Sequence, residues 1–439
     1  MSFKKNKRKK ANQWINKFKT VSKEEIIKAN TKRKKFFDFF NKNNVKYACD
    51  NLSKPYINKL SPGCSTCING TWSCLFINEL CTRNCFFCAQ DRKIKKESLP
   101  KANHFRFEKV EEYINYLKKF NFKGIGFSGG EPFLVFDRLV EYIKKIRQVF
   151  GSEHYLWIYT NGDLVTEEKL KLLAKLGLNE IRFDLSARDY DLKPVKLAVK
   201  HIKTVTIEIP AIPEDLEKVK SLLKKFEKIG VKFLNIHQLF ITNFSYPEFI
   251  KREYTFLRAP SPRLLVLESE FAAFKLLEYA IKNNLKIGIN YCSYFYKIRF
   301  QNSNAKKRIA NRFKEKKDLI TKSGYLRNIK HISDSNKKII YFDYICKLKN
   351  KIHSSLKDYK KEDFKRVKVN SVNLNNKTLV ILFKKLFLEN KSFKKTADEL
   401  AELYNLDNID KKDLLKDIEE FYNNFESLEY LPIGFPEYY

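Results

Sequence analysis

Three cysteines, Cys81, Cys85 and Cys88, lie in the short run Cys-Thr-Arg-Asn-Cys-Phe-Phe-Cys. This CxxxCxxC spacing lets three thiolates reach around one loop, and cysteine thiolates are the usual ligands of iron–sulfur clusters. Three thiolates can hold three irons of a [4Fe–4S] cube, which leaves one iron without a protein ligand. We therefore predict a [4Fe–4S] cluster on Cys81, Cys85 and Cys88, with one iron open to a further ligand.

Two other uses of these cysteines explain the spacing less well. A structural zinc site needs four ligands, which usually come as CxxC pairs. A disulfide would need an oxidising compartment. The sequence shows no secretory apolar segment near its N-terminus and no apolar run of the ~18 residues that a membrane span needs. We therefore expect a cytoplasmic protein with reduced thiols and no membrane contact.

A second motif, Ser128-Gly129-Gly130-Glu131-Pro132, follows about forty residues downstream. Residues 124–128 have the composition of a short buried strand that runs into it. Paired glycines allow a ligand to approach the backbone closely, and the Glu131 carboxylate could pair with an ammonium group. Gly-Gly-Glu by itself is typical of an ordinary turn, so its value lies in its order and distance from the three cysteines.

Together the two motifs resemble those of the radical S-adenosylmethionine (SAM) superfamily. In that family the CxxxCxxC loop follows the first barrel strand and has an aromatic residue before its third cysteine, a position that Phe87 fills here. A GGE-type motif after the second strand binds the amino group of SAM. The resemblance implies that Ser128, Gly129, Gly130 and Glu131 bind SAM. It also implies an electron from ferredoxin or flavodoxin, and reductive cleavage of SAM to a 5′-deoxyadenosyl radical that abstracts hydrogen from a substrate.

Strand and helix patterns alternate from residue 70 to about residue 295. Helical patterns cover Val110–Phe120, Phe136–Phe150, Glu167–Lys175 and Leu216–Ile229. The strand candidates are 73–79, 124–128, 155–160, 180–185, 203–209, 232–238 and 285–290. Such alternation predicts an α/β fold with a parallel sheet. The resemblance implies a partial (β/α)6-type TIM barrel, open on one side.

Several of these strands have one polar face. The polar residues that share such a face are Arg182, Asp184 and Ser186, then Thr204, Thr206 and Glu208, then Asn235 and His237. We interpret this face as a wet lumen, because the alternative would bury carboxylates against apolar helices. The resemblance implies that Asp184, Ser186, Glu208 and His237 contact SAM, with Asn161 as a further candidate. His237 could equally be a core histidine, and Asn161 could belong to a routine turn.

Further cysteines indicate a possible second cluster. Cys64 and Cys67 form a CxxC before the first strand, and Cys292 follows the last strand candidate. In a nearly closed barrel the first and last strands would be neighbours, so Cys292 could meet the pair and bind iron–sulfur or zinc. Cys49 or Cys74 could be the fourth ligand. The alternative is that Cys74, Cys292 and Cys346 are small buried apolar residues.

The formal net charge of +36 leaves a nucleic-acid partner possible. We do not favour it, because the lysines are spread along the chain. The preferred function is a radical SAM enzyme acting on a protein, peptide or small molecule. An RNA-modifying radical SAM enzyme and a non-catalytic iron–sulfur or zinc protein are the alternatives. Residues 60–300 resemble an uncharacterised group related to pyruvate formate-lyase activating enzyme.

The sequence predicts three regions. Residues 1–60 form a basic helical extension, with a capping box of Ser22 and Glu25. Residues 61–300 form the barrel. Residues 301–439 form an α+β or helical accessory region, with two strands in 325–345 and helices in 377–390, 393–404 and 410–428.

Overall fold

The computed structural model describes most of the chain up to residue 314 and parts of the remainder. The described residues are 13–49, 52–90, 96–102, 105–259, 263–314, 319–320, 324, 326–333, 338–348, 364–374, 395 and 398. They divide into two compact units: one reaches Gln301 and the other begins at Asn302. Each unit is described by itself.

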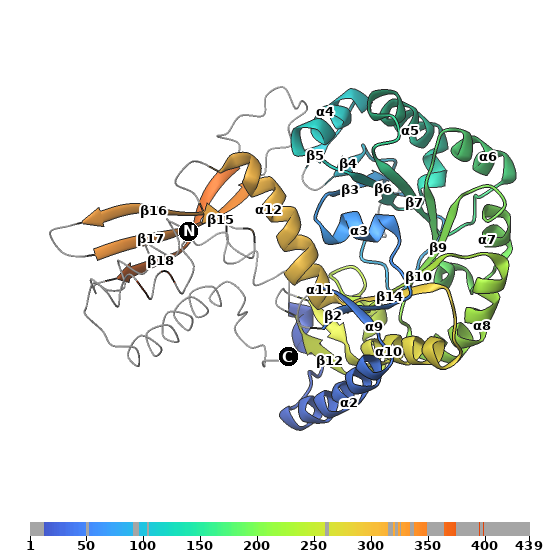
Figure 1. Ribbon diagram of the computed structural model, residues 1–439, viewed down its shortest axis with the longest axis horizontal. Helices are drawn as coiled ribbons and strands as arrows, with labels where there is room; N and C mark the ends of the chain where they lie inside the picture. Colours follow the sequence, from blue (N-terminus) through green and yellow to red (C-terminus); the bar gives the residue numbers. More distant parts are fainter. Residues whose placement is uncertain are drawn as a thin grey trace. The chain divides into compact units, whose positions relative to one another are not determined.

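The first unit is built on a parallel sheet that curves into a partial barrel (Figure 1). Its parallel strands are β3 (Trp72–Asn78), β6 (Gly124–Gly129), β7 (Tyr155–Thr160), β8 (Glu180–Phe183), β9 (Thr204–Pro210), β10 (Phe233–His237) and β14 (Gly288–Cys292). The predicted partial barrel is confirmed, and β14 adds a seventh parallel strand to the six that the resemblance implies.

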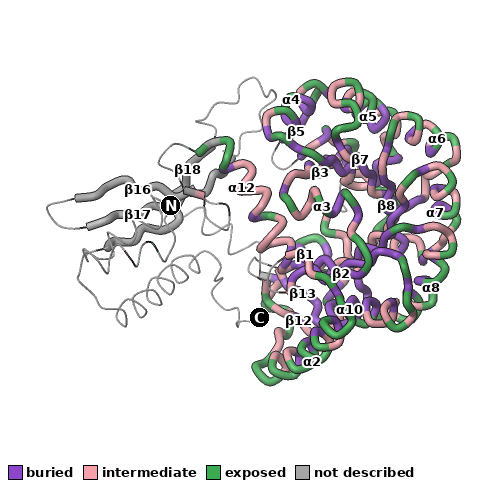
Figure 2. Tube along the Cα trace, viewed as in Figure 1, coloured by how far each residue is buried: buried purple, intermediate pink, exposed green. Residues whose placement is uncertain are grey.

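Helices cover the outer face of this sheet, as Figure 1 shows. They are α4 (Val110–Phe120), α5 (Phe136–Phe150), α6 (Glu167–Lys175), α7 (Lys193–Ala198), α8 (Leu216–Ile229) and α10 (Leu267–Lys282). Each of the four predicted helices has its predicted bounds. Their apolar positions recur at helical spacing, so one stripe of each helix packs on the strands. Figure 2 shows the buried residues concentrated in the strands and along these inner stripes.

The first and last parallel strands are not neighbours, contrary to the prediction. The free edge of β3 carries the short strands β4 (Lys101–Ala102) and β5 (Phe105–Arg106). The free edge of β14 instead pairs with β2 (Ser53–Ile57), which pairs with β1 (Lys46–Cys49). Both β1 and β2 fall in the extension that was predicted to be helical. The hairpin completes the sheet at the edge where a closed barrel would have placed β3.

The helix α3 (Pro62–Ile68) lies inside the curve of the sheet (Figure 1). The Ser61 hydroxyl accepts a hydrogen bond from the Cys64 backbone N–H at 3.2 Å and caps this helix. Gly63 allows a close approach to β8, since a Cβ there would lie 2.4 Å from Nη2 of Arg182. The helix thereby fills part of the lumen that ordinary barrels fill with side chains from their strands.

The N-terminal helix α2 (Lys23–Lys42) packs on α10. It begins with the predicted capping box, in which Ser22 and Glu25 bond to each other's backbone N–H groups. The guanidinium of Arg33 donates to the Glu270 carboxylate at 2.6 and 3.0 Å, and both side chains are buried. The preceding turn η1 (Gln13–Lys17) places Trp14 in an apolar cluster of the barrel unit.

That cluster belongs to an insertion between β10 and α10. Its small sheet contains β11 (Phe240–Ile241), β12 (Phe256–Arg258) and β13 (Leu264–Val266), next to α9 (Tyr246–Phe249). The remaining turns of the unit are η2 (Pro132–Val135), η3 (Leu185–Arg188), η4 (Pro213–Asp215), α11 (Tyr294–Tyr296) and η5 (Lys297–Gln301).

The second unit contains α12 (Asn302–Phe313) and an antiparallel sheet. Its strands follow in the order β15 (Leu319–Ile320), β16 (Leu326–Ser333), β17 (Lys338–Leu348) and β18 (Phe364–Leu374). The strand pair predicted in 325–345 is confirmed as β16 and β17, whereas β18 was not predicted. The helices predicted in 377–390, 393–404 and 410–428 lie outside the described residues, except for two isolated helical positions, 395 and 398. Within the described residues, every helix is too short or too polar to cross a membrane.

Candidate functional site

A cavity of about 780 Å³ opens where the parallel strands of the barrel end. This is the end at which (β/α) barrels place their active sites. Nearly all of the predicted site residues of the SAM region line it: Cys81, Cys85, Cys88, Ser128, Gly129, Gly130, Glu131, Asn161, Asp184, Glu208 and His237. Arg182 and Lys297, which were not predicted as site residues, also line it.

The cysteine loop is held at both of its ends. Where it leaves β3, the buried Asn78 accepts a hydrogen bond from the Leu80 N–H at 2.5 Å and donates to the Glu131 carbonyl at 3.0 Å. At its other end, Phe86 and Phe87 pack against the apolar cluster of the insertion. The Arg252 guanidinium lies 3.8 Å from the Phe86 ring centroid. The aromatic residues between the cysteines are therefore anchors for the loop.

The three thiols of this loop fit a cluster with three protein ligands. Cys81 is exposed, while Cys85 and Cys88 are partly buried, and all three face one cavity. Within the part of the chain that is described, no three Cys, His, Asp or Glu side chains are arranged around one metal ion. Thiolates bind metal as they lose their protons, and the three cysteines of this anchored loop all line the same cavity.

The backbone around the end of β6 requires both Gly129 and Gly130. Gly129 has φ +118°, and a Cβ on it would lie 1.9 Å from the Asn78 carbonyl oxygen. A Cβ on Gly130 would lie 1.7 Å from the Leu80 carbonyl oxygen. We predicted that a ligand approaches these glycines, and they do line the cavity. Their lack of a Cβ, however, serves the approach of the cysteine loop to the end of β6.

Glu131 is 1% exposed, and donors of the chain surround its carboxylate. Oε1 accepts from the Thr160 hydroxyl at 2.8 Å and from the Phe133 N–H at 3.1 Å, and Oε2 accepts from the Asn161 N–H at 2.8 Å. Burial raises the pKa of Glu131 to about 6, against the lowering effect of these hydrogen bonds. The carboxylate ties the turn after β6 to the end of β7. Its predicted pairing with an ammonium group stays a prediction.

Asn161 begins the loop after β7 and contacts the cysteine loop. Its Nδ2 donates to the Thr82 hydroxyl at 2.8 Å and lies 3.8 Å from the Cys81 Sγ. Two residues later, the Asp163 carboxylate accepts two hydrogen bonds from Arg83 at 2.6 and 2.7 Å. The sequence analysis missed Asp163 and Arg83, because an ion pair between two loops has no sequence signature.

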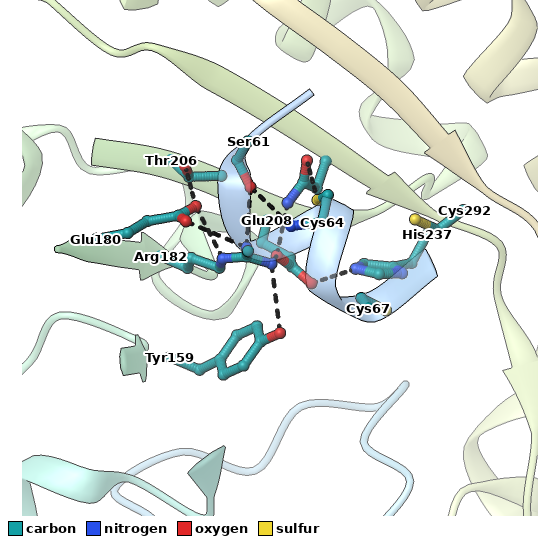
Figure 3. A network of polar contacts seen from close by, with 12 residues as sticks. Ser61, Cys64, Cys67, Tyr159, Glu180, Arg182, Thr206, Glu208, His237 and Cys292 are labelled. Carbon is teal, nitrogen blue, oxygen red and sulfur yellow. Dashed lines mark hydrogen bonds and ion pairs between the residues drawn. The ribbon is translucent and has the colours of Figure 1, made fainter. Parts of the chain in front are cut away.

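A buried polar network lies beside α3 (Figure 3), and Arg182, Glu208 and His237 of this network line the cavity. Arg182 forms ion pairs with Glu180 at 2.9 Å and with Glu208 at 2.8 Å, and it donates to the Ser61 hydroxyl at 3.0 Å. Its guanidinium also lies 4.9 Å from the Trp157 ring centroid. The predicted polar lumen is therefore confirmed for β8 and β9. Glu180 was missed, since it stands at the first position of its strand.

His237 and Glu208 form a pair in this network. Nε2 of His237 lies 2.5 Å from Glu208 Oε1, and Asn235 donates to Oε2 at 2.8 Å. Burial lowers the pKa of His237 to about 4, and Lys297 adds to this effect. Although burial opposes ionisation, Arg182 and His237 hold the pKa of Glu208 well below its usual range. Nδ1 of His237 is buried without a hydrogen-bond partner among the described groups.

The prediction that Asp184 and Ser186 share a strand face is wrong. The strand β8 ends at Phe183, and Ser186 lies in the turn η3. Asp184 still lines the cavity, but the Ser186 hydroxyl donates to the Asp184 carboxylate and Ser186 is not part of the cavity wall. Burial raises the pKa of Asp184 to about 6. The predicted contact of Ser186 with SAM stays a prediction.

Comparison with known proteins identifies the family. Residues 75–243 match the model of the radical SAM superfamily. A Methanocaldococcus jannaschii protein, named as a candidate glycyl-radical enzyme activating enzyme, is 33% identical over 281 residues, which cover 61% of this chain and 72% of that protein. The chain belongs to the radical SAM superfamily. The superfamily implies a [4Fe–4S] cluster and SAM, and makes this chain an enzyme related to the activating enzymes.

Other matches are shorter or more distant. GTP 3′,8-cyclase of Aquifex aeolicus is 33% identical over 105 residues, or 24% of this chain and 32% of the cyclase. The crystal structure of Streptococcus suis SuiB matches with 12% identity and a TM-score of 0.39, covering 61% of this chain and 55% of SuiB, so this chain spans little more than half of that protein.

Proposed function

We propose that this radical SAM enzyme cleaves SAM reductively in the 780 Å³ cavity and directs the resulting radical at a hydrogen of a protein or peptide substrate. The observation that carries the proposal is the joint placement of Cys81, Cys85, Cys88 and the Gly129–Gly130 backbone on one cavity wall. The cluster, when bound, supplies the electron for cleavage of the sulfonium. The chain supplies binding, orientation and exclusion of water.

In this proposal, the groups that line the cavity have separate roles. The three cysteines would hold the cluster, and the backbone of 128–130 would bind the amino group of SAM. Asp184 and His237 face the same space from the ends of β8 and β10, and Nδ1 of His237 has no described partner. These two residues are suited to hydrogen-bond the polar ribose or adenine edge of SAM. Glu131 would act through the loop that it ties to β7.

Two observations support a protein or peptide substrate. The loop residues Cys81, Thr82, Arg83 and Asn84 are all exposed at the cavity mouth, where a macromolecule could reach them. The relative with 33% identity is named for the activation of another enzyme. A low-potential donor such as ferredoxin or flavodoxin would reach the cluster over the same exposed loop.

An anaerobic assay tests the reaction. The reconstituted protein is given dithionite and SAM, and 5′-deoxyadenosine is measured for the wild type and for Cys81→Ala/Cys85→Ala/Cys88→Ala. We expect the wild type to form 5′-deoxyadenosine and the variant to form none. The matched control is Cys74→Ala, because Cys74 lies within β3 outside the loop, and this variant should retain cleavage. Equal cleavage by wild type and triple variant would refute the proposal.

A further inference from the structure

The barrel lumen contains a second group of cysteines, which the proposed reaction does not use. Cys64 and Cys67 stand on α3 at a spacing of three residues, which places both on one face of the helix. Cys292 is the last residue of β14. Cys49 is the last residue of β1. The four come from three separate segments of the chain, and the fold brings these segments together on the side of the Arg182 network away from the Cys81 loop.

A chain of polar contacts connects the two sides of this group. The Sγ of Cys64 lies 3.6 Å from Oδ1 of Asn235, and that oxygen also accepts from Asn290. The Sγ of Cys292 lies 3.2 Å from Oδ1 of Asn290. Figure 3 shows Cys64, Cys67 and Cys292 in one neighbourhood beside His237.

Lys54 reaches into the middle of the group. Its side chain is among the largest that are fully buried, with 1% of the residue exposed. Its Nζ lies 2.5 Å from the Cys292 Sγ, 2.7 Å from Asn290 Oδ1 and 4.6 Å from the Tyr296 ring centroid. The Tyr296 hydroxyl in turn lies 3.9 Å from the Cys67 Sγ. The contacts therefore form a continuous chain from Cys64 to Cys67, which runs through Asn235, Asn290, Lys54 and Tyr296.

The Lys54 ammonium needs an anion. A buried charge without a counter-charge is costly, and among the ion pairs of the described residues none contains Lys54. Its Nζ instead contacts the Cys292 sulfur and the Asn290 amide oxygen. Thiolates bound to a metal centre would supply the missing negative charge, because cysteine binds a metal as the thiolate.

The pairing of β1 with β2 selects the fourth ligand. Cys49 stands opposite Ser53, the residue directly before Lys54 in the chain. Cys74 lies elsewhere, because its side chain contacts Ser128 on the cavity side of β6. Of the two candidates that the sequence leaves open, the geometry favours Cys49.

We propose that Cys49, Cys64, Cys67 and Cys292 hold a second iron–sulfur cluster in the barrel lumen, with Lys54 donating hydrogen bonds to its sulfur atoms. Four sulfurs on one zinc ion must stand about 3.8 Å apart, given a Zn–S distance of ~2.3 Å. Within the described residues no three such side chains meet in that way. A cluster carries sulfide atoms that can accept hydrogen bonds from the Lys54 ammonium, whereas a single zinc ion carries none. The site is independent of the reaction proposed above.

Metal and sulfide analysis after anaerobic reconstitution tests the site without measuring activity. We expect about eight irons and eight sulfides in the wild type, and about four in Cys81→Ala/Cys85→Ala/Cys88→Ala, if each site holds a [4Fe–4S] cluster. Cys64→Ala/Cys67→Ala/Cys292→Ala should also keep about four, and Cys74→Ala about eight. An iron-free Cys81 triple variant, or one that binds one zinc in place of iron, would overturn the proposal.

Two single variants guard against a triple variant that fails to fold. Cys49→Ala should lower the iron content or the yield of the second cluster's EPR signal, whereas unchanged iron and signal would remove Cys49 from the ligand set. Lys54→Gln should retain the irons but make the midpoint potential of the second cluster more negative, because a positive hydrogen-bond donor to sulfur is lost. An unchanged potential would contradict the role given to Lys54.

Discussion

The two cysteine groups of the barrel unit are built in opposite ways. Cys81, Cys85 and Cys88 come from one exposed loop, and their spacing alone makes them recognisable. Cys49, Cys64, Cys67 and Cys292 come from two strands and a helix, and the group surrounds a buried lysine. The first group can be identified by local sequence, whereas the second depends on the fold of the whole unit. The Arg182 network separates the two and contacts both sides.

The largest effect on the free energy of unfolding is expected from Arg182→Met, which removes the central residue of the network between the two cysteine groups. The change leaves Glu180 and Glu208 buried without their cation and removes the hydrogen bond to Ser61 at the start of α3. Removing one partner of a buried ion pair costs about 3–5 kcal/mol. Denaturant unfolding of the metal-free protein measures the loss. Arg83→Met is the matched control, since the Arg83 side chain is 42% exposed and Asp163 keeps its ion pair with Arg188, so we expect a loss of about 0–1 kcal/mol. Equal losses in the two variants would show that the network does not support the lumen.

A second large effect, on the rate of 5′-deoxyadenosine formation, is expected from Gly130→Ala. This change acts on the cysteine loop and not on the second cysteine group. Its Cβ would lie 1.7 Å from the Leu80 carbonyl oxygen, so β3 and the loop must shift. A misplacement of about 1 Å can cost about a hundredfold in rate, and we expect a loss of that order in 5′-deoxyadenosine formation. The control is Gly151→Ala. Its φ of +56° is strained for alanine, but no atom lies within 4 Å of the added Cβ, so cleavage should persist. The iron of the second group should be unchanged in both variants.

The sequence could predict most of the barrel and the outer cysteine group, because these follow from periodicity and short motifs. The helix bounds of α4, α5, α6 and α8 depend only on local apolar spacing. The register between β1, β2 and β14 has no such local signal, and it sets the places of Cys49 and Lys54. The prediction that Cys292 lies near Cys64 and Cys67 rested on a closed barrel. The structure instead brings them together because α3 enters the lumen. Glu131 shows the same limit of prediction from local sequence. Its hydrogen-bond donors come from the turn after β6 (Phe133) and from the end of β7 (Thr160 and Asn161).

A smaller effect on the free energy of unfolding is expected from a change of pH, through the titration of His237. Its pKa is about 4 in the fold and near 6.5 in the unfolded chain, so the unfolded chain binds more protons between these values. This contribution to stability is present above pH 6.5 and is lost as the pH falls toward 4. We expect His237→Gln to reduce the fall in the free energy of unfolding between pH 6.5 and 4, measured on the metal-free protein. His201→Gln serves as a control at a surface ion pair outside the lumen. A wild-type pH dependence that survives His237→Gln unchanged would contradict the neutral state of His237.

The smallest effect on global stability is expected from Arg252→Ala, at the contact between the insertion and the cysteine loop. Arg252→Ala removes the guanidinium that lies 3.8 Å from the Phe86 ring centroid. Such a cation–π contact is worth about 0.5–1 kcal/mol at a partly exposed site, so global stability should change little. The loop, however, depends on Phe86 and Phe87 for its outer anchor. We therefore expect faster amide exchange across residues 84–88 and slower reconstitution of the first cluster, with α3 exchange unaltered. Lys251→Ala, at an exposed neighbouring position, should alter neither. Faster exchange in α3 as well would mean that the two cysteine groups are coupled rather than built separately.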